Sequence, residues 1–152
     1  MRMDRSQSKN AFEVVNNYSL SELTKILFKF GQERFSKKIA RAIVNRRRKA
    51  PLLTTFQLRD LVESVINPRY RIKSLARVFQ AIRIEVNDEL SELKQGLDQA
   101  IRLLTSGGRL CMISYHSLEH RLIKDQMRRE SKGCVCPPEV PVCRCGAKAT
   151  LR

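Results

Sequence analysis

The stretch GGRLCMISYHSLEHRLIK, residues 107–124, decides which fold the sequence predicts. Its two glycines predict a tight turn, and the apolar run RLCMISY at 109–115 predicts a buried β-strand. The basic segment SLEHRLIKDQMRR then has a helical pattern, with Ser117 as its candidate N-cap. Helix, glycine turn, buried strand and helix in this order are typical of an α/β crossover unit.

One strand does not make a sheet, because a parallel strand is buried on both faces and bonds to neighbours. The run near 109–115 is the one convincing strand in the 152 residues, and the remaining pattern is mostly helical. Either another molecule completes the sheet, as a second copy would in a homodimer, or the chain is part of a longer protein.

Two helices upstream, over 18–31 and 54–66, begin with the spacing of a capping box, in which side chain and backbone bond reciprocally. The capping pairs are Ser19 with Glu22 and Thr54 with Gln57. Apolar stripes predict two further helices, one over 33–49 and a long one over 74–104. We expect Gly31 to stop the first helix and Gly96 to bend the last.

The charge of the chain is strongly positive, with a formal net value of +15. Most of it lies in residues 1–73, which contain 17 Lys and Arg against 6 Asp and Glu. Such a surface attracts polyanions, so we expect nucleic acid as the partner, ahead of an anionic membrane surface. The plainer alternative is a basic surface that serves solubility alone.

The predicted helix over 33–49 separates its cations from its apolar stripe. The cations that lie off the stripe and are expected to contact RNA are Arg34, Lys37, Lys38 and Arg41. The run RRRK at 46–49 has a structural alternative, because basic residues suit the C-terminal end of a helix dipole. The N-terminus lacks the apolar stretch of a signal peptide, and no run is long enough to span a membrane, so we expect a cytoplasmic protein without a membrane partner.

Two motifs, RVFQAIRIEVNDEL at 77–90 and ISYHSLEHRLIK at 113–124, resemble the bacterial small-subunit (16S) ribosomal RNA cytosine-N4 methyltransferases. The segments GQERFSKKIARAI, TTFQL and CVCPPEVPVCRCG are also similar to the family, as is the opening MRMD. The family departs from this chain at Lys73-Ser74, where it usually has His-Pro, and at His120, where it usually has Asp.

The resemblance implies an α/β, Rossmann-like class I methyltransferase with a helical insertion. Residues 1–73 would be the basic helical insertion that recognises RNA, 74–130 a helix–strand–helix of the methyltransferase domain, and 131–152 a Cys-rich loop segment. The implied reaction transfers a methyl group from S-adenosylmethionine to the N4 atom of a cytidine in small-subunit rRNA, either free or in the 30S subunit.

The family's N-terminal half, with its Gly-rich cofactor loop, precedes the residue that matches Met1. We find no G-x-G-x-x-G in the sequence. We therefore assign no cofactor-binding residue to this chain and expect it to be inactive alone. Two alternatives stay open: a non-catalytic basic RNA-binding helical module, and an incomplete product that folds poorly by itself.

Ser114, His116 and Ser117 follow the predicted strand at its carboxyl end, where open α/β sheets bind ligands. The resemblance implies that they shape the pocket for the extruded cytosine. The structural alternative is that Ser117 caps the next helix and His116 bonds to the backbone. A Ser-His hydrolase is disfavoured, because the sequence has no G-x-S-x-G and adjacent side chains diverge at a strand end.

A polar helix face in the first motif is a further candidate for RNA contact. Its residues recur at three- and four-residue spacing: Arg77, Gln80, Arg83 and Asn87. Arg suits phosphate oxygens, and Asn and Gln suit base edges. The alternative is that these side chains join parts of the protein, with Glu85, Asp88 and Glu89 as partners of the arginines. Arg121 of the second motif is also assigned to RNA.

Five cysteines are present, and Cys111 in the predicted strand is expected to be a small buried side chain. The other four form C-x-C, six residues, C-x-C: Cys134, Cys136, Cys143 and Cys145. Four thiolates this close suggest zinc, although a single intervening residue constrains tetrahedral ligation. Disulfides are disfavoured in the cytosol. The family is not defined as zinc-dependent, so we assign no metal and keep the four as candidates.

Overall fold

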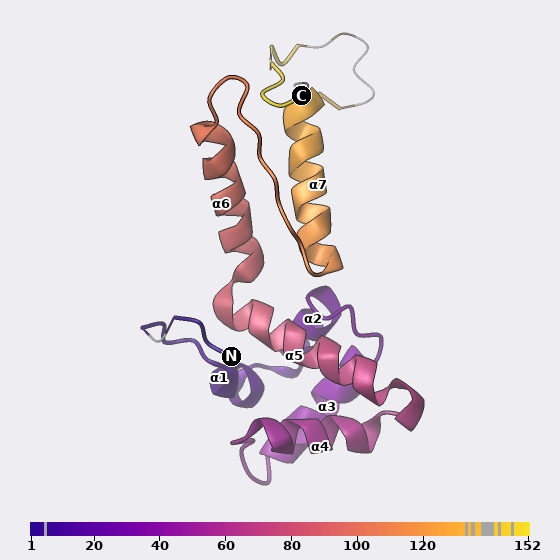
Figure 1. Cartoon of the computed structure of the whole chain (residues 1–152). Helices are drawn as coiled ribbons and strands as arrows, with labels where there is room; N and C mark the ends of the chain where they lie inside the picture. The colour runs from indigo at the N-terminus through magenta and orange to yellow at the C-terminus, as the bar shows by residue number, and fades with distance from the viewer. Residues whose placement is uncertain (5, 133, 135, 138–141, 143, 147) are drawn as a thin grey trace. The chain divides into compact units, whose positions relative to one another are not determined.

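The computed structural model describes residues 1–4, 6–132, 134, 136–137, 142, 144–146 and 148–152 (Figure 1). The chain divides into two compact units, unit 1 (Met1–Glu89) and unit 2 (Leu90–Arg152). The helices are α1 (Ala11–Asn17), α2 (Leu20–Lys29), α3 (Ser36–Arg47), α4 (Thr55–Val65), η1 (Pro68–Tyr70), α5 (Arg71–Asn87), α6 (Glu89–Leu103) and α7 (Ser117–Lys132). In the described part of the chain no helix is long and apolar enough to cross a membrane.

Both predicted capping boxes are confirmed. At α2 the Ser19 hydroxyl accepts from the Glu22 N–H at 3.2 Å, and the Glu22 carboxylate accepts from the Ser19 N–H at 2.7 Å. These bonds hold the pKa of the Glu22 carboxyl below its usual value. At α4, Thr54 and Gln57 make the same reciprocal pair. Each box satisfies backbone donors that the first helical turn leaves unbonded.

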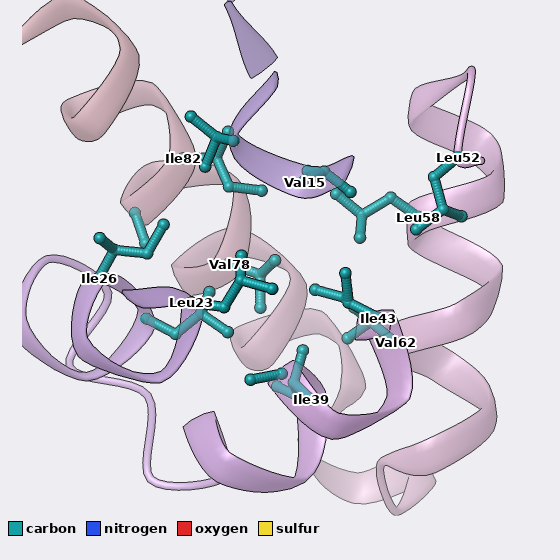
Figure 2. Close-up of a cluster of buried hydrophobic side chains, with 14 of the residues drawn as sticks. Val15, Leu23, Ile26, Ile39, Ile43, Leu52, Leu58, Val62, Val78 and Ile82 are labelled. Atoms are coloured by element: carbon teal, nitrogen blue, oxygen red, sulfur yellow. The ribbon is translucent and has the colours of Figure 1, made fainter. Parts of the chain in front are cut away.

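The core of unit 1 is made by the apolar stripes of its helices. Figure 2 shows these side chains converging on one another. Helix α3 packs against α2 and α4, and α5 packs across α1, α2 and α4. The buried residues of this core are Val14, Val15, Leu23, Ile26, Leu27, Ile39, Ala40, Ile43, Leu52, Leu58, Val62, Ile66, Val78, Ala81, Ile82 and Val86.

The N-terminal segment is bonded to α5. The Met3 N–H donates to the Asn87 side chain at 2.8 Å, and the Asn87 amide donates to the Met1 carbonyl at 2.9 Å. Glu85 accepts from the Lys9 ammonium at 2.9 Å and from the Tyr18 hydroxyl at 2.6 Å. Burial and the bond to Glu85 raise the pKa of Tyr18, and the same carboxylate raises the pKa of Lys9.

Gly31 allows the end of α2 to approach α5 closely. A Cβ atom at this position would lie 2.6 Å from the Arg77 carbonyl oxygen and 2.8 Å from that of Leu27. The Gln80 side chain donates to the Phe30 carbonyl at 3.2 Å across the same junction. The helix does end before Gly31, as predicted, but the left-handed residue of the turn is Gln32, with φ of 50°. The glycine is therefore required by space rather than by its own backbone angles.

The long helix predicted over 74–104 is two helices, and the expected bend at Gly96 is wrong. The break lies at Asp88, whose φ of 49° and ψ of 36° are left-handed. Asp tolerates this conformation because its short side chain bonds locally. Gly96 lies inside α6, where a glycine costs about 1 kcal/mol relative to alanine without breaking the helix.

The strand expected over 109–115 is not present, and the described residues contain no strand at all. Exposed and half-buried residues alternate along the segment, as side chains do along an extended chain. Ile113 is 78% exposed, Tyr115 is 91% exposed, and Cys111, which we expected to be buried, is exposed. A strand requires a bonded neighbour, and no second extended segment of the described chain pairs with this one.

In unit 2, helices α6 and α7 contact each other through polar side chains. The buried Gln126 amide donates to the Asp98 carboxylate at 2.7 Å and to Glu130 at 3.1 Å. Leu97 is the one fully buried apolar residue among the described residues of unit 2. The described residues of unit 2 therefore form no hydrophobic core of the kind that unit 1 has.

Replacing Gly31 with alanine should destabilise unit 1 by about 1–3 kcal/mol, because the added methyl group overlaps backbone atoms. Thermal unfolding followed by circular dichroism measures this change. Gly96→Ala is the matched control, since a Cβ atom there meets nothing within 4 Å. It should leave the free energy of unfolding unchanged or raise it by up to about 1 kcal/mol. An equal loss in both variants would contradict the close approach.

Candidate functional site

His116 and Glu119 form a reciprocal pair at the start of α7. The Glu119 N–H donates to His116 Nδ1 at 3.3 Å, and the Glu119 carboxylate accepts from the backbone N–H groups of Tyr115 at 2.9 Å and His116 at 3.3 Å. Since α7 begins at Ser117, the N-cap is His116 and the expectation that Ser117 caps the helix is wrong by one residue. The arrangement is a capping box with histidine in place of serine.

The bonds of this box fix the state of the imidazole ring. Because Nδ1 accepts, the neutral ring carries its proton on Nε2. Nε2 lies 3.2 Å from the other Glu119 oxygen but makes no hydrogen bond with any described residue. Ser114 is half-buried in the extended segment, and Ser117 is exposed at the first turn. The start of α7 therefore brings one imidazole, with its Nε2 buried beside Glu119, and two hydroxyl groups together within four residues.

Glu119 is the partner that the sequence reasoning left without a role. Its signal was present, because His116 and Glu119 have the i, i+3 spacing of a capping box. Histidine is not among the preferred N-cap residues, so the spacing alone does not identify this box.

The polar face of α5 is engaged inside unit 1. Arg83 makes a two-pronged contact with Glu89, with N–O distances of 2.8 and 3.1 Å. Asn87 is buried and bonded to the N-terminal segment, and Gln80 bonds to α2. These bonds give the three residues a structural role. Their contact with RNA stays a prediction.

Arg77 belongs to the same face and stands beside a buried carboxylate. Glu33 is fully buried, and its Oε2 lies 3.9 Å from Nη1 of Arg77. Its Oε1 accepts from the Phe35 N–H at 2.9 Å, while Oε2 has no hydrogen bond with the described residues. A buried charge of this kind needs a nearby counter-charge, which Arg77 supplies.

The α3 basic face (Arg34, Lys37, Lys38 and Arg41) is exposed. The ion pairs found among the described residues include none of its members. The Arg34 guanidinium lies 3.9 Å from the ring centroid of Tyr70 and 4.5 Å from that of Phe35. These rings hold Arg34 in place without neutralising it.

Other cations of α3 bond within the protein. The Arg47 guanidinium donates to the carbonyls of Val15 and Tyr18, and that of Arg46 donates to the Ala50 carbonyl. Burial lowers the pKa of Arg47. Arg46 thus bonds at the end of its own helix, whereas Arg47 bonds to residues at the end of α1, a contact that the structural alternative did not predict.

In unit 2, Arg121 is exposed on α7. Three of the candidate cysteines come together: the sulfur atoms of Cys134, Cys136 and Cys145 all lie within 4.8 Å of one another. Cys143 lies outside the described residues.

Comparison with known proteins places these features in context. The chain matches the MraW methylase family over residues 1–152. A protein named ribosomal RNA small subunit methyltransferase H from Caldicellulosiruptor saccharolyticus is 49% identical over 152 residues, which are 99% of this chain and 50% of that protein. Proteins of the same name from Carboxydothermus hydrogenoformans and Dehalococcoides mccartyi are 49% and 46% identical, over 100% of this chain and 50% and 43% of their own lengths.

The relatives are thus methyltransferases by name. This chain belongs to the MraW methylase family, as the resemblance of its motifs indicated. It spans about half the length of the curated relatives that it matches.

Removing the Glu119 side chain should fray the first turn of α7, because two backbone N–H groups lose their acceptor. Glu119→Ala should cost about 0.5–2 kcal/mol locally, seen as faster amide hydrogen exchange near residue 119. Glu119→Gln keeps an acceptor and should restore most of the protection. Equal fraying in both variants would show that the charge, rather than the box, protects the helix end.

Proposed function

We propose that this chain is part of a methyltransferase that moves a methyl group from S-adenosylmethionine to the N4 atom of a cytidine in small-subunit rRNA, in the cytoplasm. The observation that carries the proposal is the family match over the whole chain, with relatives near half identity that are named for small-subunit rRNA. The separate roles below rest on the exposed charge of unit 1 and the polar groups at the start of α7.

The α3 basic face supplies the proposed contacts to RNA phosphates. Its cations are exposed and lack carboxylate partners among the described residues, so no internal ion pair must break before they bind. Unit 1 as a whole contains 19 Lys and Arg against 9 Asp and Glu. Binding of this kind releases counterions and therefore weakens steeply with salt.

Ser114, His116 and Ser117 supply the proposed contacts to the cytosine. A base that reacts at an exocyclic amine must leave its stack and be held by its Watson–Crick edge. The imidazole N–H and the two hydroxyl groups are suitable donors for that edge, and the box with Glu119 holds the histidine backbone in place. Holding the base fixed places its amine in line for transfer.

The described residues do not fit the cofactor. The glycine turn at 107–108 precedes the extended segment, whereas a cofactor loop follows a strand and opens a helix. A Cβ atom at Gly108 would lie 2.9 Å from the Leu104 side chain, so this glycine serves local packing. We derive no step through S-adenosylmethionine on these residues and attribute its binding to the part of the longer protein that lies outside this chain.

Methyl transfer tests the proposal directly. A longer protein that contains this chain should transfer labelled methyl groups from S-adenosylmethionine to unmethylated small-subunit rRNA, and nucleoside mass spectrometry should find N4-methylcytidine. This chain alone should transfer none. His116→Ala in the longer protein should slow transfer by about 100-fold through misplacement of the base. His120→Ala, an exposed neighbour on α7, is the control. A methyl group on any other atom, or on protein, would overturn the proposal.

RNA binding tests the role of unit 1. Removing Lys37, Lys38 and Arg41 together should weaken binding of small-subunit rRNA by about tenfold or more and reduce the salt slope by about 2–3. Lys94→Ala, Arg102→Ala and Lys132→Ala together remove the same charge from unit 2 and should change the slope less. Equal effects of the two triple variants would contradict a localised interface.

A non-catalytic RNA-binding module is the second candidate. It is favoured by one observation, namely that unit 1 has its own core and most of the positive charge. Salt-sensitive binding together with a longer protein that transfers no methyl group would support it.

A further inference from the structure

The thiol cluster (Cys134, Cys136 and Cys145) lies in the segment that follows α7. The Cys145 sulfur is 3.9 Å from that of Cys134, and all three sulfurs lie within 4.8 Å of one another. Cys145 is nine residues beyond Cys136, so the chain must fold back to bring them together. Neither the RNA interface nor the cytosine pocket uses these side chains.

The sulfur spacing matches that of ligands around a shared metal ion. A zinc–sulfur distance of about 2.3 Å in a tetrahedron separates neighbouring sulfurs by about 3.8 Å. A disulfide would bring two sulfurs to about 2.05 Å. The 3.9 Å between the Cys145 and Cys134 sulfurs, which is the distance of a thiol hydrogen bond, is also close to the edge of a tetrahedral thiolate site.

The backbone around the cluster is tied back to the helix. The Thr150 N–H donates to the Glu130 carbonyl at 3.0 Å, and the Thr150 hydroxyl donates to the Glu130 carboxylate at 2.6 Å. Gly146, directly after Cys145, has a φ of +61°, a left-handed turn that favours glycine. The segment thus returns to the end of α7, with the cluster between the two tied ends.

The described residues of the segment supply no buried apolar side chain. No described residue from 134 onwards is buried, and Val142 is 68% exposed. Small segments without a core are held by cross-links, either disulfides or metal ions. The surrounding sequence contains Lys132, Arg144 and Lys148, whose positive charge balances that of metal-bound thiolates.

We propose that Cys134, Cys136 and Cys145 hold a zinc ion that fixes this segment against α7. The three thiolates occupy three positions of a tetrahedral ion. The ion is proposed as structural because it cross-links a segment whose described residues are not buried. The inference is independent of the proposed function, since it concerns metal content and not methyl transfer.

Metal analysis of this chain, purified under reducing conditions, tests the site. We expect one zinc ion per chain, measured by inductively coupled plasma mass spectrometry. After removal of zinc, titration with Co²⁺ should give a thiolate-to-cobalt charge-transfer absorption that saturates at one equivalent and that zinc displaces. Cys134→Ser should abolish stoichiometric binding. Cys111→Ser, which removes the exposed cysteine of the 109–115 segment, should leave it unchanged.

Two results would overturn the proposal. One is a chain with reduced thiols that shows neither zinc nor the charge-transfer absorption. The other is an intact mass lower by about 2 Da under native isolation, which would mean that the thiols pair as a disulfide. Because the cobalt titration uses the unsubstituted chain, a folding defect in Cys134→Ser does not affect it. A cooperative melt of unit 1 in each variant shows that the rest of the chain is intact.

Discussion

The packing of α5 across the other helices is the interaction on which unit 1 depends. Val78, Ala81 and Ile82 of α5 belong to the core, and α5 contacts α1, α2 and α4. The polar side chains of α5 bond elsewhere: Gln80 donates to the Phe30 carbonyl, and Asn87 accepts from the N-terminal segment. Helix α5 therefore contributes both to the core and to the bonds that hold the N-terminal segment. Gly31 allows the end of α2 to lie close to the α5 backbone.

Local patterns predicted the helices of unit 1 because their signals are local. Ser19 and Thr54 satisfy backbone donors a few residues away, so a capping box can be recognised without knowledge of the fold. The break at Asp88 escaped prediction because glycine is the commoner left-handed residue and Gly96 stood nearby. The seven-residue α1 was also missed, since one short helix carries too little periodicity.

The strand and the role of the α5 face depend on partners far away in sequence. The segment 109–115 has strand composition, but pairing requires a neighbour that the described chain does not supply. Arg83 and Asn87 look like RNA contacts in sequence, yet Glu89 and the N-terminal residues bind them. Sequence spacing shows which side chains share a face, but not what lies opposite. At the start of α7 the sequence singled out His116 but did not identify its capping partner, Glu119.

The two units differ in how their structure is maintained. Among the described residues, unit 2 buries one apolar side chain, Leu97, whereas unit 1 buries a continuous cluster. Burial stabilises by about 25 cal/mol per Å², so unit 2 cannot draw comparable stability from its own residues. Ile113 and Tyr115 are large apolar side chains that the described residues leave exposed. After α7 no described residue is buried from 134 onwards, and a metal held by thiolates is a cross-link that needs no core.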